Sequence, residues 1–344
     1  MTTRVSRSGL PAAVAHARDL VDAPLRAAVN RLENEQMRLI AGYQLGLWNA
    51  AGEPDDAGGG KALRPALVLL AAQAAGGSPD PGVPAAVAVE LVHNFSLLHD
   101  DIMDRDVERR HRPTGWVVYG EGQAILAGNA MLTAAVETLL RDDPCSARTV
   151  PVLLSTVQQL ISGQSADLAL EGDDTAQLED VLAMEEGKTA ALLAGSLALG
   201  ASAAGAAAAV VERLAEAGRL LGLAFQIVDD VLGIVGDSTV TGKSASSDIR
   251  AGKRSAPVVA ALNSGTDAGR ELRDLLHDGP PESEEQIVRA VQLIEAGGGL
   301  TWAAAESERL LEQAVDQLHA AGLEHDGAAG DLEQVARFLV RRDW

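Results

Sequence analysis

The sequence predicts an all-α protein that folds as one domain of ten or more helices. Alanine dominates the composition, aromatic residues make up only 3% of the chain and only 13 of its 344 residues are proline, so intrinsic propensity favours helix almost everywhere. Apolar residues recur at helical spacing throughout, and no alternating pattern typical of strands extends over a useful length. No fixed-period repeat divides the chain.

Helix boundaries are predicted where Gly, Pro, Ser and Asp gather. Five such segments are expected to form loops or helix ends: residues 52–61, 76–84, 171–174, 235–248 and 278–285. None is long enough to be an interdomain linker. We therefore expect one folded domain over residues 21–344, preceded by an N-terminal tail, residues 1–20, that is either disordered or a docking peptide for a partner protein.

Composition also limits the compartment and the partners. A formal net charge of −21 disfavours nucleic acid and anionic membranes as partners of the surface. The single cysteine, Cys145, excludes an internal disulfide and a thiolate metal cluster. The N-terminus lacks the apolar core of a signal peptide, which predicts a cytoplasmic protein. The Ala/Gly/Ser-rich run 189–211 is interpreted as two buried helices broken near Gly200 to Gly205 rather than as a transmembrane segment.

The helix expected from about Pro84 through the sequence HDDIMD carries the first chemical signal. Glu90, His93, Asp100 and Asp104 return to nearly one line on a helix of 3.6 residues per turn, which makes one polar stripe. The opposite positions form an apolar stripe that would pack inward: Val87, Leu91, Phe95, Leu98 and Ile102. Carboxylates four residues apart repel one another unless a cation compensates, and Mg²⁺ suits this role because it takes oxygen ligands from carboxylates, water and substrate phosphates.

A second acidic segment, FQIVDDVLG, follows at residues 225–233. Gly222, Gln226, Asp229 and Gly233 share one face of the helix expected there. A single acidic motif in an acidic protein is also consistent with a solvated surface. The presence of two such motifs favours a metal site. Two acidic helices that face each other across a cavity could hold a small cluster of Mg²⁺ ions.

Lysine is used sparingly and at particular places. Only four of the 28 basic residues are lysine, all at loop or helix-end signals and all directly after glycine: Lys61, Lys188, Lys243 and Lys253. Free backbone N–H groups and glycine suit phosphate binding at such places, although a Gly-Lys pair is also typical of an ordinary helix C-cap. Arg64, Arg109 and Arg110 can add bidentate contacts to phosphate. Together these residues indicate a substrate with a diphosphate head and a hydrocarbon tail.

Other polar residues near the motifs admit two interpretations. His99 is a catalytic group or a hydrogen-bond partner of a carboxylate. Glu185 and Glu186 extend the metal site or form a solvated helix end. Gln164 and Asp167 would face the cavity from one side of a helix and hold water or a bridging group.

The ordered motifs resemble those of the trans-isoprenyl diphosphate synthases, or polyprenyl synthetases, from about Gln36 to the C-terminus. They read GGGKALRP, ELVHNFSLLHDDIMD, ERRHRPT, GQSADL, GKTA, FQIVDD, GDSTVTGKSASSD and GKR, and the series is far more specific than any one member. The resemblance implies the isoprenoid synthase fold, an all-α bundle around a deep central cavity, and a homodimer. It also implies a Mg²⁺-dependent prenyltransferase that condenses isopentenyl diphosphate head-to-tail with dimethylallyl, geranyl or farnesyl diphosphate.

The same resemblance implies ligands for the metals and for both diphosphates. Asp100 and Asp104, supported by Asp101, resemble the first metal motif, and Asp229 with Asp230 the second, for three Mg²⁺ ions per active site with substrate bound. Isopentenyl diphosphate would be held by Lys61, Arg64, His93 and Arg110. The allylic diphosphate would be held by Arg109, Lys188, Thr189, Gln226, Lys243 and Lys253. Asp100, Asp104, Asp229 and Lys188 would carry the catalytic ionisation.

Two positions depart from the family pattern. Gly233 stands where the second motif usually ends in Asp, and Asn129 follows Gly128 where the family usually has Gly-Asp. We expect altered metal affinity from the first departure and altered hydrogen bonding around the site from the second. Phe95, five residues before the first motif, with the small Ser96 beside it, resembles the pocket floor of geranylgeranyl diphosphate synthases and predicts a twenty-carbon product. Farnesyl and longer products remain alternatives, and a core position explains Phe95 equally well.

Two other functions remain open, a class I terpene synthase on the same fold and a non-catalytic regulatory subunit of a prenyl synthase complex. The GGGKALRP segment with His93 and Arg110 argues against the first, because a cyclase needs no isopentenyl diphosphate site. Retention of the first acidic motif and of all four lysines argues against the second.

Overall fold

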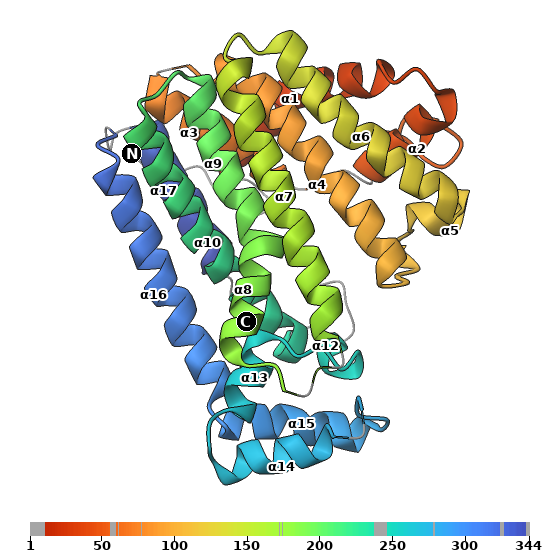
Figure 1. Ribbon diagram of the computed structural model, residues 1–344, viewed down its shortest axis with the longest axis vertical. Helices are drawn as coiled ribbons and strands as arrows, with labels where there is room; N and C mark the ends of the chain where they lie inside the picture. The colour runs from red at the N-terminus through yellow and green to blue at the C-terminus, as the bar shows by residue number, and fades with distance from the viewer. Residues whose placement is uncertain are drawn as a thin grey trace. The chain divides into compact units, whose positions relative to one another are not determined.

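The computed structural model describes residues 11–55, 60, 62–76, 78–171, 173, 175–236, 246–277, 279–323 and 327–341. These residues are almost entirely helical (Figure 1), which confirms the all-α prediction and the expectation of ten or more helices. The chain forms two compact units, and each is built from segments distant in sequence.

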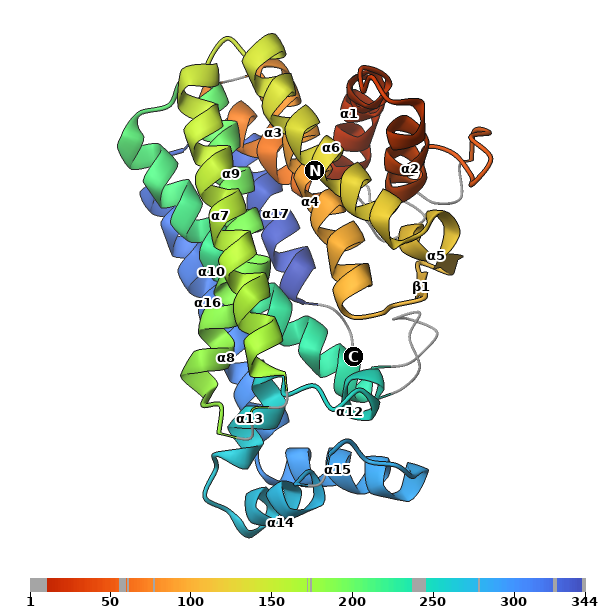
Figure 2. The same ribbon diagram turned by 45° about the vertical axis from the view of Figure 1, so that its right-hand side comes forward.

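The first unit comprises residues 1–157, 195–215 and 318–335. Its main elements are α1 (Ala12–Asn30), α2 (Glu35–Leu45), α3 (Leu63–Gly76), the 3₁₀ turn η1 (Asp80–Gly82), α4 (Val83–Met103), strands β1 (Glu108–Arg109) and β2 (Arg112–Pro113), α5 (Gly115–Tyr119) and α6 (Glu121–Asp142). Helix α4 contacts α1, α2, α3, α5 and α6 (Figure 2), and the five side chains of its predicted apolar stripe are each at most 7% exposed. The predicted inward face of α4 is therefore confirmed.

Helix α1 begins early in the segment expected to be a tail. It starts at Ala12, directly after Pro11, and the side chains of Val14 and Ala17 are buried. Proline suits this place because it lacks the N–H that a first helical turn would leave without a partner. Helical structure thus covers residues 12–20, and residues 1–10 lie outside the described part of the chain.

The second unit comprises residues 158–194, 216–317 and 336–344. It holds parts of α7 (Ser146–Leu170), α9 (Ala191–Ala203), α10 (Ala208–Val235), α16 (Gly299–Ala320) and α17 (Ala328–Val340). It also contains α8 (Leu178–Glu185), the π-helical turn η2 (Glu186–Ala190), α12 (Ser247–Arg250), α13 (Ala256–Leu262), α14 (Asp267–Leu275) and α15 (Glu284–Ala296). Helices α13, α14 and α15 pack together around a buried aliphatic cluster that includes Val258, Leu272 and Ile287 (Figure 2).

Glycines let α7, η2 and α10 approach one another closely in the second unit. A Cβ on Gly163 of α7 would lie 2.1 Å from the backbone nitrogen of Lys188, and a Cβ on Gly222 of α10 would lie 2.4 Å from Cα of Ala190. Only glycine permits backbones to pass at such distances. The π turn is therefore held between two helices, a setting in which this rare conformation often marks a functional site.

The apolar run 189–211 contains a break, as predicted. Helix α9 ends at Ala203 and α10 begins at Ala208, with Gly205 in a left-handed conformation between them. Two other segments, Asp80–Met103 and Glu121–Asp142, are long and apolar enough to cross a membrane by length and composition alone. Most of the first is buried inside the protein, as in the core helix of a soluble protein, and less of the second is buried.

Candidate active site

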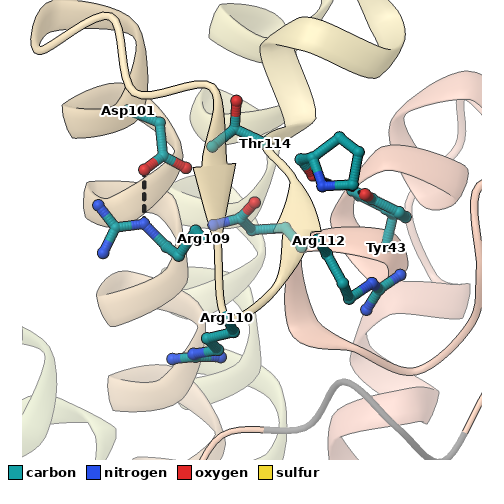
Figure 3. A pocket seen from close by; sticks show the side chains of 8 residues that line it. Tyr43, Asp101, Arg109, Arg110, Arg112 and Thr114 are labelled. Atoms are coloured by element: carbon teal, nitrogen blue, oxygen red, sulfur yellow. Dashed lines mark hydrogen bonds and ion pairs between the residues drawn. The ribbon is translucent and has the colours of Figure 1, made fainter. Parts of the chain in front are cut away.

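The first acidic motif lies at the C-terminal end of α4, and its aspartates differ in environment. Asp100 and Asp104 are partly exposed, and Asp104 is the cap residue, whose backbone N–H donates to the carbonyl of Asp100 at 2.8 Å. Asp101 is fully buried, and Nε of Arg109 donates to its Oδ1 at 2.5 Å (Figure 3). Burial raises the pKa of Asp101 to about 6, although the positive charge of Arg109 opposes the rise.

Arg109 also lies near other carboxylates of the motif. Its Nη2 is 3.7 Å from Oδ2 of Asp100 and 3.6 Å from Oδ2 of Asp106. The second oxygen of Asp101, Oδ2, is buried, and no described residue donates a hydrogen bond to it. The end of α4 thus gathers more negative charge than one arginine neutralises.

The three arginines of the ERRHRPT motif stand on a hairpin with a strained turn. Arg109 pairs with Arg112 across strands β1 and β2, and the two turn residues, Arg110 and His111, have φ of +54° and +59°. Such a two-residue turn normally contains Asn-Gly, because other residues are strained at positive φ. In Figure 3, Arg109 extends toward Asp101, whereas Arg112 lies on the other side of the hairpin beside Tyr43.

Tyr43 of α2 stabilises the position of this hairpin. The guanidinium of Arg112 lies 4.3 Å from the centre of the Tyr43 ring, a cation–π contact, and the Tyr43 hydroxyl donates to the carbonyl of Pro113 at 2.6 Å. Nη2 of Arg112 also donates to the carbonyl of Trp48 at 3.2 Å. These contacts hold β2 and thereby support the turn that carries Arg110. Sequence reasoning assigned no role to Tyr43 or Arg112, although Arg112 belongs to the quoted motif.

Arg64, His93 and Arg110 come together in the first unit. Nη1 of Arg64 lies 3.2 Å from Nε2 of His93, and because a guanidinium can only donate, Nε2 accepts and the imidazole is neutral with its proton on Nδ1. Burial lowers the pKa of His93 well below its usual value, and the charges of Arg64, Arg110 and Arg109 lower it further. A Cβ on Gly60 would lie 3.3 Å from Nη1 of Arg110, so this guanidinium lies against the end of the GGGK segment.

Glu90 adds a carboxylate to this group of cations. Burial raises its pKa, whereas Arg64, Arg110 and a hydrogen bond of 3.1 Å from Nδ2 of Asn94 lower it. The polar stripe predicted on α4 is therefore present, with a cationic part around His93 and an anionic part around Asp100. Lys61, predicted beside Arg64, and Lys243 lie outside the described residues.

In the second unit, the π turn η2 carries Lys188 and Thr189. Nζ of Lys188 donates to Oδ2 of Asp167 on α7 at 2.5 Å, and Oγ1 of Thr189 donates to Oε1 of Gln226 on α10 at 2.7 Å. Two consecutive residues thus reach two different helices. The prediction that Lys188 follows a helix end is wrong, because Gly163 and Gly222 make room for the helical segment to continue through it.

The two aspartates of FQIVDD have opposite environments. Asp229 is exposed, whereas Asp230 is 5% exposed and accepts hydrogen bonds from Nε2 of Gln226 at 2.7 Å and from the backbone nitrogen of Ala256 at 3.2 Å. Burial raises the pKa of Asp230 to about 6. Asp229 and Asp230 therefore repeat the arrangement of Asp100 and Asp101, in which one carboxylate of each adjacent pair is accessible and the other is buried.

Glu185 is not part of a solvated helix end. Its side chain is 3% exposed, and burial together with the neighbouring Asp230 carboxylate raises its pKa well above the usual value. Glu186 is the more accessible of the two and accepts from Nη1 of Arg219 at 2.9 Å. The sequence signal for the burial of Glu185 is weak, because an EEGK segment looks the same in a solvated C-cap.

Lys253, by contrast, follows a helix end as predicted. Gly252 has φ of +68°, its N–H donates to the carbonyl of Ile249, and the N–H of Lys253 donates to the carbonyl of Asp248 at 2.9 Å. This pair of bonds is the Schellman motif that closes a helix at a left-handed glycine. The side chain of Lys253 is exposed beyond it.

His99 contacts α6 next to the Gly128-Asn129 pair. Nε2 of His99 is hydrogen-bonded to the carbonyl of Ile125 at 3.1 Å, so its partner is the backbone of α6 rather than a carboxylate. Gly128 makes this contact possible, because a Cβ there would lie 2.2 Å from the same nitrogen. Asn129, the next residue, is exposed on α6. The His99 ring also meets Phe95 edge-on at 5.4 Å.

Comparison with known proteins relates this geometry to one family. The sequence profile described as "Polyprenyl synthetase" matches residues 56–294. A (2E,6E)-farnesyl diphosphate synthase of Mycobacterium tuberculosis is 44% identical over 343 residues, which cover 98% of this chain and 95% of that protein. A geranylgeranyl diphosphate synthase of the same organism is 42% identical over 312 residues, which cover 90% and 87%.

Solved structures show the same fold. A polyprenyl synthetase from Streptomyces coelicolor superposes with a TM-score of 0.91 at 43% identity, covering 96% of this chain and 99% of that one. A geranylgeranyl pyrophosphate synthase from Corynebacterium glutamicum, complexed with isoprenyl diphosphate and magnesium, has a TM-score of 0.82 at 26% identity, with coverages of 96% and 99%. The chain therefore belongs to the polyprenyl synthetase family of prenyltransferases.

Proposed function

We propose that the protein condenses isopentenyl diphosphate head-to-tail with dimethylallyl, geranyl or farnesyl diphosphate to give a trans-polyprenyl diphosphate. The observation that supports this most is the convergence of Arg64, His93 and Arg110 on the stripe of α4 that ends in Asp100 and Asp104. An enzyme that joins two diphosphate substrates needs two anion-binding sites, whereas a cyclase needs only one.

In this proposal, the cationic part of the polar stripe on α4, around His93, binds isopentenyl diphosphate. Arg64 and Arg110 offer planar forks that match diphosphate oxygens. Neutral His93 holds Arg64 through Nε2 and keeps Nδ1–H as a further donor. Lys61, next to Gly60, completes the proposed set.

The allylic diphosphate takes a second set of ligands. Arg109 contributes from the hairpin, where Asp101 fixes its guanidinium. Lys188 and Thr189 contribute from η2, oriented by Asp167 and Gln226 respectively. The complete proposed set is Arg109, Lys188, Thr189, Gln226, Lys243 and Lys253.

The acidic residues fit magnesium. Oδ2 of Asp101 is a buried oxygen that no described residue supplies with a donor, and a donor set made only of oxygen suits a hard cation. We assign Asp100, Asp101 and Asp104 with Asp229 and Asp230 to three Mg²⁺ ions per active site. Within the described residues, no three Asp, Glu, His or Cys side chains form a preassembled metal site. This is expected if water and substrate phosphates provide the remaining ligands.

The residues then support an ionisation mechanism. Bound Mg²⁺ would neutralise charge on the departing diphosphate. Arg109 and Lys188 stabilise the same leaving group while the allylic C–O bond breaks and its electron pair leaves with oxygen. The double bond of isopentenyl diphosphate attacks the resulting allyl cation and forms the new C–C bond. Loss of a proton to the released diphosphate restores a double bond, and an apolar pocket keeps water from the cation.

For the product we propose geranylgeranyl diphosphate, with Phe95 as the floor of the tail pocket and Ser96 beside it. Phe95 is 7% exposed, and His99 supports its ring from the side. Farnesyl diphosphate is the second candidate, favoured by the 44% identical relative that carries that name. Phe95→Ala should lengthen the product under the floor assignment, whereas the control Leu91→Ala, on the same buried stripe, should lower stability without lengthening it.

One incubation separates the reaction classes. The pure protein is supplied with Mg²⁺ and an allylic diphosphate, with and without isopentenyl diphosphate, and products are identified by mass after phosphatase treatment. Elongated alcohols formed only with both substrates support the proposal, a hydrocarbon from the allylic substrate alone indicates a terpene synthase, and activity only after addition of another protein indicates a regulatory subunit. Asp100→Ala should lower turnover by orders of magnitude, while the exposed control Asp19→Ala should not; near-normal turnover of Asp100→Ala contradicts the metal assignment.

We also propose a cytoplasmic homodimer that associates through α6. The outer face of this helix exposes Ile125, Leu126 and Leu140 at 41%, 55% and 63%, an apolar strip suited to a second copy. The net charge of −21 disfavours an anionic membrane as the alternative partner. Leu140→Glu should shift the protein toward monomer in analytical ultracentrifugation, and an unchanged dimer would place the interface elsewhere.

A further inference from the structure

Arg110, in the turn between β1 and β2, is positioned by its backbone rather than by contacts of its side chain. Its guanidinium makes no hydrogen bond or ion pair within the described residues, whereas Nε of Arg109 beside it donates to Asp101 at 2.5 Å. The backbone of the turn is itself strained, because Arg110 and His111 have φ of +54° and +59°, a region that glycine adopts readily and other residues do not. The place of Arg110 therefore depends on contacts made by the rest of the hairpin.

Arg112, the next arginine of the hairpin, makes such contacts. Figure 3 shows its side chain beside Tyr43, on the other side of the hairpin from Arg109, and its guanidinium lies 4.3 Å from the centre of the Tyr43 ring. Nη2 of Arg112 donates to the carbonyl of Trp48 at 3.2 Å and lies 3.9 Å from Oδ2 of Asp55. Arg112 thus joins β2 to the segment that follows α2.

That segment, residues 46–55, is called the α2 loop below, and it is fixed to α2. Nε1 of Trp48 donates to the carbonyl of Leu39 at 2.8 Å, and an isolated β bridge pairs Trp48 with Pro54. The Trp48 ring lies so close to α2 that a Cβ on Gly42 would be 1.8 Å from its Cζ2. The carbonyl that accepts from Arg112 is therefore held in place by the packing of its own side chain.

Tyr43 adds a second attachment, which does not pass through the α2 loop. Its side chain is 7% exposed, and its hydroxyl donates to the carbonyl of Pro113 on β2 at 2.6 Å. A cavity of about 30 Å³, large enough for water, lies beside these contacts and is lined by Tyr43, Gln44, Arg110 and Thr114 among others. The hairpin is therefore held here by specific contacts rather than by close packing.

We propose that Arg112 and Tyr43 are positioning residues for isopentenyl diphosphate. They fix β2 to α2 and to the α2 loop, and thereby hold Arg110 at the place from which it binds this substrate. The inference rests on the proposed function and names residues outside its proposed ligand sets. Arg109 has its own support in Asp101, so loss of these contacts should affect isopentenyl diphosphate and leave the allylic diphosphate nearly unaffected.

Steady-state kinetics of the full chain, with isopentenyl diphosphate and geranyl diphosphate varied in turn, test the proposal. Tyr43→Phe removes the hydroxyl that donates to Pro113 and should raise KM for isopentenyl diphosphate about 3- to 10-fold. Arg112→Ala removes the ring contact and the bond to Trp48, and should raise it about tenfold or more. In both variants kcat and KM for geranyl diphosphate should change by less than about twofold. Arg112→Lys, which keeps the charge, should recover part of the loss.

Tyr119→Phe is the matched control for Tyr43→Phe. The Tyr119 hydroxyl also donates to a backbone carbonyl, that of Ala50 at 3.0 Å, and its ring meets Tyr43 edge-on at 5.5 Å. Its bond reaches the α2 loop away from Trp48 and does not reach β2, so its loss should leave both KM values unchanged. Melting curves identify a variant that does not fold, and Tyr43→Phe and Arg112→Lys, the mildest changes, then decide the outcome.

Calorimetric titration with isopentenyl diphosphate measures the same effect without turnover, and both variants should bind more weakly by the factors given for KM. Unchanged binding in Tyr43→Phe and Arg112→Ala, an equal rise in KM for both substrates, or the same loss in Tyr119→Phe would each overturn the inference. A wild type that makes no elongated product rejects the proposed function, and the titration then decides the inference by itself. An active wild type with unaffected variants rejects this inference alone.

Discussion

Replacement of Gly163 by alanine tests whether the close approach of α7 to η2 sets the position of Lys188. The added Cβ would lie 2.1 Å from the backbone nitrogen of Lys188 and 2.3 Å from the carbonyl carbon of Gly187. Both are backbone atoms that cannot rotate away, so the two segments must separate by about 1 Å to reach ordinary contact. Overpacking of this kind lowers the free energy of unfolding by about 1–3 kcal/mol.

The same displacement should impair catalysis. Lys188 contacts Asp167 of α7 at 2.5 Å, and a misplacement of about 1 Å in a substrate ligand can lower kcat/KM about a hundredfold. Urea denaturation and steady-state kinetics with the allylic substrate varied measure the two effects. Gly122→Ala is the control, because a Cβ there meets nothing within 4 Å and should leave kcat/KM unchanged. A Gly163→Ala enzyme with wild-type stability and wild-type kcat/KM would refute the reasoning.

Three further predictions concern stability. His111→Gly should raise the free energy of unfolding by up to about 1 kcal/mol, because it relieves a positive φ in the hairpin turn, and an unchanged urea midpoint would contradict this. The folded-state pKa of His93 is depressed, so below about pH 6.5 the unfolded state binds a proton that the folded state does not, and stability falls by up to about 1.4 kcal/mol per pH unit until the folded pKa is reached. Urea denaturation at several pH values should show this dependence of the free energy of unfolding on pH in the wild type and not in His93→Gln. The same pH dependence in both proteins would contradict the prediction. Mg²⁺ alone should barely change the melting temperature, because no preassembled metal site exists among the described residues. Mg²⁺ with diphosphate at 100 times its dissociation constant should raise the free energy of unfolding by about 2.7 kcal/mol. Equal stabilisation by Mg²⁺ alone would argue against a metal that is bound jointly by the protein and the diphosphate.

The helical fold could be predicted because its evidence is local. The apolar positions of α4 recur at helical spacing and are buried as that spacing requires, and the loops fall where Gly and Pro gather. The hairpin of β1 and β2 could not be predicted in this way. Its strands are two residues long, too short for an alternating pattern, and Arg110-His111 lacks the Asn-Gly signature of such a turn.

The candidate site was only partly predictable, because its finer features depend on contacts between distant segments. A Gly-Lys pair looks like a helix C-cap in sequence, and only the packing of Gly163 and Gly222 shows why the chain continues through Lys188. The lowered pKa of His93 depends on its burial and on the charge of Arg64, 29 residues away. Asp248 ends the GDSTVTGKSASSD motif, and no local pattern shows that its Oδ2 would lie 2.0 Å from a Cβ on Gly233 of α10.

The π turn η2 determines how the second unit tolerates changes in chain length. A π turn accommodates an extra residue relative to an α-helical path. Deletion of one residue from this turn would let the segment close as an ordinary α-helix, and the side chains after it would keep their faces. Leu192 and Leu193, 2% and 3% exposed, would therefore stay buried. The loss of one residue should thus spare the packing of α9 and change only the turn itself, which carries Lys188 and Thr189.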